Sequence, residues 1–220
     1  MNYRFTNRTG GVSTGAFASL NLGTHVGDEL LAVMENRRLV AESLGSVQYM
    51  SQVHGSRVVV IEGVVDADPT ADALVTGISG IALAVQVADC IPLLLSSNEA
   101  VAAVHVGRKG LVNGVAQRTV DVMREMGAGS ITAIIGPAIC GQCYEVSEEL
   151  FQEVTSIYPE ANSETKSGTF SLDLPKALVG VLQGLNIEVR NESSCTLESK
   201  DLFSYRRDAM TGRQAGFIWL

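Results

Sequence analysis

The sequence has no hydrophobic run long enough to cross a membrane and no recognisable export signal. None of its apolar runs reaches the roughly 20 residues that a membrane-spanning helix requires. No N-terminal segment combines a basic start with an apolar stretch and a small-residue cleavage site. We therefore expect a soluble, cytoplasmic protein.

Basic residues are also scarce. The 220 residues include 16 Lys or Arg and 24 Asp or Glu, which gives a formal net charge of −8 and a pI of about 4.9. Nucleic acids and anionic membranes attract basic surfaces, so neither is expected as a partner. An anionic small molecule is not excluded, because it needs only a local basic pocket.

The four cysteines are too few for the disulfide framework of a small secreted protein. We expect reduced thiols, at least one of which has a chemical role. Cys140 and Cys143 form a C-G-Q-C motif, which suits either redox chemistry or half of a zinc site. Redox use is not expected, because the chain has no second C-x-x-C motif and no thioredoxin-like context. Cys143 is predicted to line the substrate pocket.

Hydrophobic patterning predicts the fold class. Apolar strands alternate with helical segments, and several strands follow one another without a helix, which favours an α/β fold with a mixed sheet. We find no repeat or linker and treat residues 1–220 as a single domain. A helix is predicted to begin after an N-cap at Asp28 and to end at Leu44, with Leu30, Val33 and Val40 on one face. Residues 1–27 are rich in Gly, Ser, Thr and Asn and are expected to form a loop.

The stretch from Ala82 to Gly110 contains two residues that suit a metal centre. Strands are predicted over residues 81–88, 91–95 and 100–106, with Cys90 and His105 at strand ends. These two residues are fifteen positions apart and can meet if adjacent strands end at the same edge of a sheet. His54 follows another short apolar run. Two imidazoles and one thiolate suit zinc and leave open the fourth position that catalytic zinc sites keep.

Each of these residues also has a simpler interpretation. A free cysteine is most often a buried apolar residue. Cys90 can alternatively act as a nucleophile without metal, with His105 as its general base, which would give amide hydrolysis. His25 is expected to stabilise the N-terminal loop by hydrogen bonding rather than to bind a metal.

Basic residues gather in three places that suit an anion. The V-G-R-K-G loop precedes a predicted helix, whose N-terminal N–H groups attract anions, and Arg108 and Lys109 add charge. Arg206 belongs to an arginine-rich segment, residues 206–213, that forms either a solvated turn or a clamp for phosphate or carboxylate. Arg8 is either a solvated surface charge or an anion-binding group that reaches over the active edge.

Eight segments resemble the laccase-domain family, whose members are described as multicopper polyphenol oxidases and as purine nucleoside phosphorylases. They are NRTGGVSTGAFASLNLGTHVGD, ENRRLVAESLG, SQVHGSRV, ADALVT, ADCIPLLL, AAVHVGRKG, IGPAICGQCYEV and SYRRDAMTGRQAGFI. They occur in family order across nearly the whole chain. The resemblance implies a three-layer α/β/α sandwich with zinc held by His54, Cys90 and His105.

The resemblance also implies activity on purine nucleosides. Family members carry out phosphorolysis of adenosine, inosine, guanosine or methylthioadenosine and hydrolytic deamination of adenosine, and some bacterial members are linked to correcting peptidoglycan precursors. Deamination has the clearer chemical route, because zinc activates water and a carboxylate, Asp89 or Glu145, would shuttle protons. Phosphorolysis needs a phosphate placed against the ribose C1′, for which Arg8, Lys109 and Arg206 are the candidates.

One loop departs from the family pattern. Where the family usually has A-V-H-A-G-W-R-G, this chain has A-V-H-V-G-R-K-G, with Arg108 in place of Trp and Lys109 in place of Arg. A stacking surface for a base and a bidentate guanidinium fork are therefore lost.

Two alternatives from other classes complete the set. Copper is the alternative metal, and copper-dependent phenol oxidation is the corresponding activity. It requires a mononuclear and a trinuclear centre rich in histidine, which three histidines cannot supply. A non-catalytic partner protein would keep its role when His54 or Cys90 is substituted.

Overall fold

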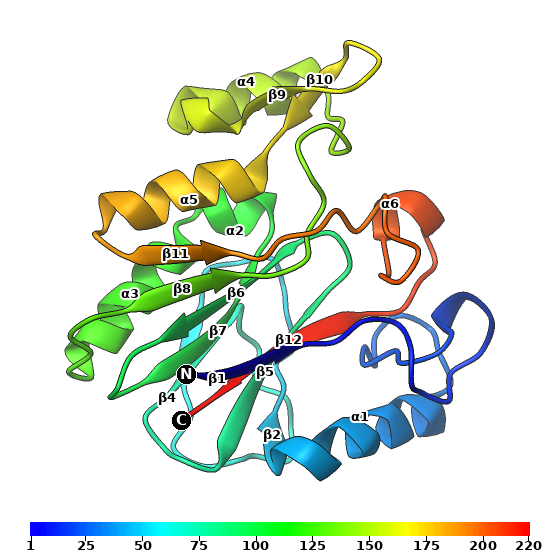
Figure 1. The fold of residues 1–220 in the computed structure, drawn as a ribbon, viewed down its shortest axis with the longest axis vertical. Coiled ribbons are helices and arrows are strands. Elements are labelled where there is room, and N and C mark those ends of the chain that lie inside the picture. Colours follow the sequence, from blue (N-terminus) through cyan, green and yellow to red (C-terminus); the bar gives the residue numbers. More distant parts are fainter.

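The computed structural model describes residues 1–220 and contains two mixed β-sheets packed face to face (Figure 1). The larger sheet has the strand order β11 (Glu188–Asn191), β8 (Thr132–Ile135), β6 (Ile91–Ser96), β7 (Val101–Val106), β4 (Ala73–Thr76) and β3 (Val58–Val60). The smaller sheet has the order β1 (Asn2–Phe5), β12 (Gln214–Trp219), β5 (Ile81–Val87) and β2 (Ser46–Gln48). Parallel pairs occur at β11–β8, β3–β4 and β2–β5, and the other pairs in these sheets are antiparallel.

Helices cover the outer faces of both sheets. The larger sheet is covered by α2 (Arg108–Val112), α3 (Val115–Glu125) and α5 (Leu174–Gly184), and the smaller one by α1 (Leu30–Leu44). The predicted α/β class with mixed pairing and helices is confirmed. The sheet layer of the predicted α/β/α sandwich consists of two sheets rather than one.

Several short elements lie outside these layers. In Figure 1, α4 (Glu148–Ile157) and the hairpin of β9 (Asn162–Glu164) and β10 (Phe170–Leu172) form a projecting unit beyond α5. The 3₁₀ helices η1 (Gly15–Phe17) and η2 (Pro159–Ala161) and the short α6 (Tyr205–Asp208) complete the chain.

The continuous apolar strands of the sequence are buried on both faces. All six residues of β6 are buried. Leu93 and Leu95 pack toward the helices, whereas Leu94 packs toward the smaller sheet. The same two-residue alternation in β7 places Val104 on the helix side and Ala103 between the sheets. Such double burial explains why these strands lack a polar face.

Three expectations for the first 44 residues are wrong. The N-terminal segment is not entirely loop, because β1 pairs with β12 and η1 lies within it. Asp28 does not cap α1; Glu29 occupies the N-cap, and the Asp28 carboxylate accepts hydrogen bonds from Ser13 Oγ and Asn21 Nδ2. The side chain of Leu30 is 58% exposed, so it does not belong to the buried face of the helix.

Asn36 anchors the N-terminal loop on α1. Its side chain is completely buried and accepts a hydrogen bond from the N–H of Val12 at 2.8 Å. Its amide group donates to the carbonyl oxygens of Ser19 and Asn21 at 3.1 and 2.8 Å. The path of residues 12–21 over the smaller sheet therefore depends on this buried side chain, together with the Asp28 carboxylate.

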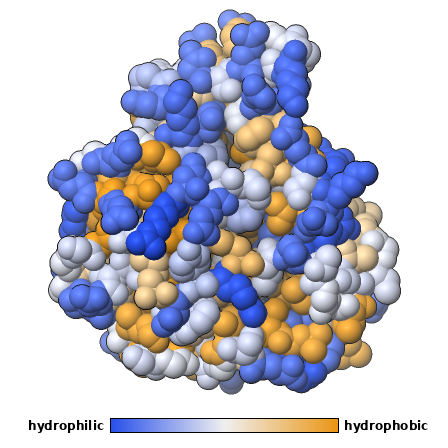
Figure 2. All heavy atoms as spheres, in the orientation of Figure 1, coloured by the Kyte–Doolittle hydropathy of each residue, from blue (hydrophilic) through white to orange (hydrophobic).

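The surface in view has no single continuous apolar face. Figure 2 shows hydrophobic patches separated by hydrophilic side chains, and mainly hydrophilic side chains on the projecting unit. No helix of the structure combines the length and the hydrophobicity needed to cross a bilayer.

Substitution Asn36→Leu is expected to lower the free energy of unfolding by about 2–4 kcal/mol, because buried backbone groups of the loop lose their partners. Urea denaturation measures this change. The matched control is Arg38→Gln on the exposed side of the same helix, where loss of the ion pairs with Glu35 and Glu42 should cost less than about 1 kcal/mol. Equal effects of the two substitutions would contradict the anchoring role.

Candidate metal centre and its cavity

The structure brings His54, Cys90 and His105 together at one edge of the larger sheet. Cys90 immediately precedes β6, and His105 lies near the end of β7, opposite Pro92 in the antiparallel register. The Cys90 Sγ lies 3.8 Å from Nε2 of His54, and the two imidazole centroids are 4.6 Å apart. One ligand atom from each of the three residues lies within 4.8 Å of the other two.

Asp72 holds two of these three side chains, although no sequence motif predicts a role for it. Its side chain is fully buried immediately before β4. Oδ1 lies 2.8 Å from Nδ1 of His105 and accepts a hydrogen bond from the N–H of His54 at 2.9 Å. Oδ2 accepts the N–H of Gly55 at 2.7 Å. An aspartate directly before a buried strand, in A-D-A-L-V-T, was the only signal available in the sequence.

The ionisation of Asp72 fixes the tautomer of His105. Burial raises the pKa of Asp72, but hydrogen bonds from His105, Gly55 and Val53 outweigh it, so that the pKa is lowered overall. An ionised carboxylate only accepts, so Nδ1 of His105 carries the proton and Nε2 remains for a metal. Carboxylates of this kind orient the histidine ligands of metal sites.

The backbone around the centre is strained and closely packed. His54 and Asp89 have φ angles of 59° and 96°, in the left-handed region that residues with side chains rarely adopt. A Cβ atom on Gly107 would lie 3.0 Å from the Cys90 Sγ and 3.1 Å from the His54 Cδ2. Glycine at this position allows the sulfur and the imidazole to approach each other.

The interaction between Cys90 and His105 shifts their pKa values in opposite directions and favours a thiolate beside an imidazolium. Burial raises the pKa of Cys90, but His105 and His54 lower it to about 6. Burial lowers the pKa of His105, whereas the Cys90 thiolate and Asp72 raise it to about 9. A thiolate at neutral pH suits both a metal ligand and a nucleophile. The two nitrogens and one sulfur fit zinc with one position left open.

A cavity of about 560 Å³ opens beside these residues, which is within the range of small-molecule sites. Four cationic side chains and one carboxylate, that of Asp89, line it, together with Tyr144 and Tyr205. The cations are Arg108, Lys109, Arg206 and Arg213. Because the whole chain carries a net charge of −8, this concentration of positive charge favours an anionic ligand.

Of the four predicted substrate-binding residues, Lys109 and Arg206 line the cavity and the other two do not. The Arg8 Nε donates to the carbonyl oxygen of Ala18 at 2.8 Å, and its guanidinium lies 4.9 Å from the centre of the Phe203 ring. Cys143 lies in a separate cluster of thiols.

Two further residues line the cavity: His25, which was not expected there, and Arg213, whose segment was expected to form either a solvated turn or an anion clamp. His25, expected to serve the N-terminal loop, lines the wall, where burial and the neighbouring Arg213 lower its pKa. Arg213 comes from the arginine-rich segment and lies on the same wall.

The two predicted proton carriers are differently placed. Asp89 lines the cavity, but its Oδ1 accepts the Thr196 hydroxyl and its Oδ2 accepts the N–H of Arg206, both at 2.6 Å. Glu145 is exposed and does not line the cavity, and its carbonyl oxygen accepts Nη1 of Arg206 at 2.7 Å. The one carboxylate on the wall is therefore occupied by structural hydrogen bonds.

Arg108 and Arg206 each contact a further side chain, the first outside the cavity and the second on its wall. The Arg108 Nη1 lies 3.4 Å from Oε1 of Glu153 on α4. The Arg206 guanidinium lies 5.0 Å from the centre of the Tyr144 ring. Cations and flat rings therefore lie side by side on the wall.

Comparison with known proteins gives matches over the full chain. A family model described as multi-copper polyphenol oxidoreductase laccase matches residues 2–220. A purine nucleoside phosphorylase of Streptomyces griseus is 47% identical, with 100% of this chain and 94% of the relative covered. A purine nucleoside phosphorylase of Streptomyces coelicolor is 46% identical, with coverage of 100% and 95%.

Solved structures share the same architecture. The Neisseria meningitidis protein NMB0706 superimposes with a TM-score of 0.91 at 39% identity, covering 99% of this chain and 93% of that chain. YlmD from Geobacillus stearothermophilus has a TM-score of 0.88 at 34% identity, with coverage of 98% and 90%.

Substitution Asp72→Asn is expected to weaken zinc binding at this centre by roughly 10–100-fold. The neutral amide would replace the charged carboxylate that orients the His105 ring and accepts the N–H groups of His54 and Gly55. Competition with a chromophoric chelator measures the affinity. Asp173→Asn is the matched control, because Asp173 caps α5 through the N–H of Lys176. Unchanged zinc affinity in folded Asp72→Asn protein would show that Asp72 does not support the centre.

Proposed function

Because the chain belongs to the multi-copper polyphenol oxidoreductase laccase family, we propose that it is a zinc-dependent purine nucleoside phosphorylase. Its substrates are adenosine, inosine, guanosine or methylthioadenosine together with inorganic phosphate. The names of the Streptomyces relatives support the substrate class. One observation carries the proposal: a single cavity combines the three metal-ligand side chains with four cations and two tyrosine rings.

The cations suit the phosphate substrate. In phosphorolysis a phosphate oxygen forms a bond to the ribose C1′, and the bond from C1′ to the purine nitrogen breaks with its electron pair leaving on the base. The dianionic nucleophile must be held against a sugar, which requires donors with positive charge. Lys109 supplies one from the start of α2, and Arg206 and Arg213 supply two from the arginine-rich segment.

The aromatic groups and Arg108 suit the base. Tyr144 and Tyr205 offer flat faces on the wall, and aromatic rings stack favourably on one another. Arg108, which replaces the tryptophan usual in the family, offers a planar guanidinium that also stacks on rings. A purine can therefore be held despite the missing indole.

His54, Cys90 and His105 would hold the zinc ion, with His105 kept in the required tautomer by Asp72. When bound, zinc would serve as a Lewis acid toward an oxygen or nitrogen atom of the substrate. Copper would have the same three donors, but phenol oxidation has no histidine-rich second centre available among three histidines.

Hydrolytic deamination of adenosine is proposed as a second, slower activity. A metal centre that opens into the cavity favours it, because water can reach the same position as the substrate. The reaction also needs a carboxylate to carry protons. Asp89 would have to give up a hydrogen bond from Thr196 or from the Arg206 backbone, and Glu145 lies off the wall.

The zinc-loaded protein is expected to release free base from adenosine and inosine only when phosphate is present, with an equal amount of ribose 1-phosphate. Ammonia should form from adenosine without phosphate, at a lower rate. Chromatography of the bases and an ammonia assay measure both products. If the zinc-loaded protein released neither free base nor ammonia, the proposal would be rejected.

Two variants sharpen this assay. Cys90→Ser should abolish both activities, because it removes a metal ligand. Lys109→Gln should raise the KM for phosphate about 10–100-fold, the range for loss of one charged hydrogen bond, and change the KM for nucleoside less. Lys176→Gln on α5 is the control, because this lysine does not line the cavity.

A metal-free Cys–His amide hydrolase, which could act on a peptidoglycan precursor, is the second candidate function. The lowered pKa of Cys90 favours it, because the thiolate would be available at neutral pH without metal. His105, whose ligand nitrogen lies within 4.8 Å of the sulfur, would serve as the proton carrier.

Alkylation of Cys90 separates the two candidates. In chelator-treated protein, the rate should rise with pH through about 6 and then level off, because the thiolate reacts and its fraction is complete above its pKa. Zinc should protect Cys90 at neutral pH, where its ligands can bind the metal in deprotonated form. Peptide mass spectrometry after iodoacetamide treatment measures the rate at this residue. Amide hydrolysis by metal-free protein, lost on alkylation, would favour the hydrolase.

A further inference from the structure

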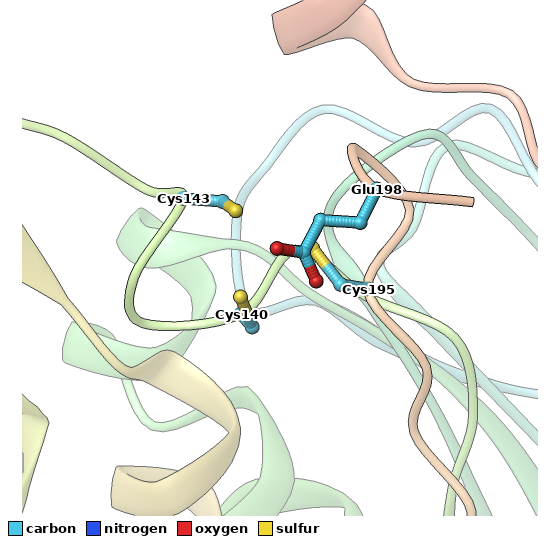
Figure 3. A group of neighbouring side chains, drawn as sticks. All are labelled: Cys140, Cys143, Cys195 and Glu198. Atoms are coloured by element: carbon cyan, nitrogen blue, oxygen red, sulfur yellow. The ribbon is translucent and has the colours of Figure 1, made fainter. Parts of the chain in front are cut away.

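A second group of potential metal ligands lies outside the cavity. Cys140, Cys143, Cys195 and Glu198 each contribute one ligand atom, and these atoms all lie within 4.8 Å of one another. Figure 3 shows the three sulfurs and the carboxylate turned toward a common centre. We propose that these four residues form a second zinc site, which is structural and distinct from the centre of His54, Cys90 and His105.

Each half of this site is a short turn. The C-G-Q-C turn is closed by the N–H groups of Cys143 and Tyr144, which donate to the carbonyl oxygen of Cys140 at 3.0 and 3.1 Å. The second turn places Cys195 and Glu198 three residues apart, and the N–H of Ser199 donates to the Cys195 carbonyl oxygen at 3.0 Å. Pairs of ligands two to four residues apart are typical of structural zinc sites.

Backbone pairing docks the two turns against each other. Ala138 and Cys195 form a parallel bridge, in which the N–H of Ala138 donates to Ser194 and the N–H of Thr196 donates to Ala138, both at 3.2 Å. The third sulfur is therefore placed beside the C-G-Q-C motif by the main chain. The fold thus places Cys195 beside the C-G-Q-C motif, which has no second C-x-x-C motif in the sequence.

The C-G-Q-C turn is also held from its other side. A Cβ atom on Gly141 would lie 2.6 Å from the Ser163 Oγ and 2.8 Å from the Asp173 Cβ. Only glycine lets the turn pack this closely on β9 and on the N-cap of α5. A cavity of about 360 Å³, lined in part by Cys140 and Cys195, leaves an entry path for the ion.

The separations are close to those that zinc imposes. Four ligands in a tetrahedron with zinc–sulfur bonds of about 2.3 Å place the sulfurs about 3.8 Å apart. The observed limit of 4.8 Å requires a contraction of about 1 Å at most, within the reach of side-chain rotation. Lys166 Nζ lies 2.9 Å from the Glu198 Oε1, so Oε2 is left for the metal and the lysine offsets part of the negative charge.

Zinc binds cysteine as the thiolate, so an ion at this site would bind all three sulfurs in that form and release their protons.

The position of the site explains what such an ion would stabilise. Tyr144 directly follows Cys143 and lines the catalytic cavity. The second turn leads to Arg206, and the adjacent Arg207 Nη1 donates to the carbonyl oxygens of Thr196 and Ser199 at 3.0 and 2.8 Å. A closed four-ligand site would therefore join the two segments that form one wall of the cavity.

Zinc content measured by mass spectrometry tests the proposal. Wild-type protein purified with zinc and dialysed should hold two zinc ions per chain. Cys90→Ser should hold one, the double variant Cys140→Ser/Cys143→Ser should hold one, and the combination of all three substitutions should hold none. One ion in the wild type that disappears with Cys90→Ser would overturn the second site and leave the first intact.

Two further measurements separate loss of a zinc ligand from loss of folding, and zinc binding from disulfide formation. Glu198→Gln keeps all three thiols and should lower the zinc affinity of Cys90→Ser protein, whereas Glu149→Gln on α4 should not. Cobalt-loaded Cys90→Ser protein should show thiolate-to-cobalt absorption that disappears with Cys195→Ser. A spectrum without thiolate ligation, or two fewer free thiols in unreduced wild type, would overturn the proposal.

Discussion

The buried carboxylate of Asp72 determines the geometry of the metal centre. A buried charge is tolerated only when hydrogen bonds replace its hydration, and Asp72 obtains them from the His105 ring and the backbone N–H groups of residues 53–55. The carbonyl oxygen of the same residue accepts the N–H of His105 at 2.8 Å, as part of the pairing of β4 and β7. The hydrogen bonds that stabilise the Asp72 charge thus fix the ring of His105 and the backbone of His54. The left-handed conformation of His54 is maintained by these bonds.

The cavity concentrates positive charge within an acidic protein. Its cations come from the start of α2 and from the arginine-rich segment near α6, so charge separated in sequence converges on one volume. Asp89, the only carboxylate on the wall, accepts hydrogen bonds from the Thr196 hydroxyl and the backbone N–H of Arg206. It therefore helps to position the segment that carries the cations. This arrangement favours phosphorolysis over a reaction that needs a free carboxylate.

Much of the centre could be predicted from the sequence, and the remainder depends on tertiary contacts. Cys90 and His105 are predictable because antiparallel strands with known ends place their termini at one edge. Asp72 is not, because an aspartate before a strand resembles any strand start until its partners are known. The path of Arg8 follows from the anchoring of its loop on Asn36, and the presence of two sheets follows from packing that continuous apolar runs do not specify. The cluster that contains Cys143 was not predicted, because Cys195, the third thiol of the cluster, lies 52 positions further along the chain.

The contact between Arg108 and Glu153 ties one cation of the cavity wall to a carboxylate on α4 that lies outside the cavity. The pair is 3.4 Å long, with the arginine 19% and the glutamate 50% exposed, so water weakens it and it can open at low cost. A ligand that engages the Arg108 guanidinium would compete with Glu153, so the net gain would be the difference between two interactions rather than the value of one. Helix α4 would thereby moderate binding in the cavity without lining it.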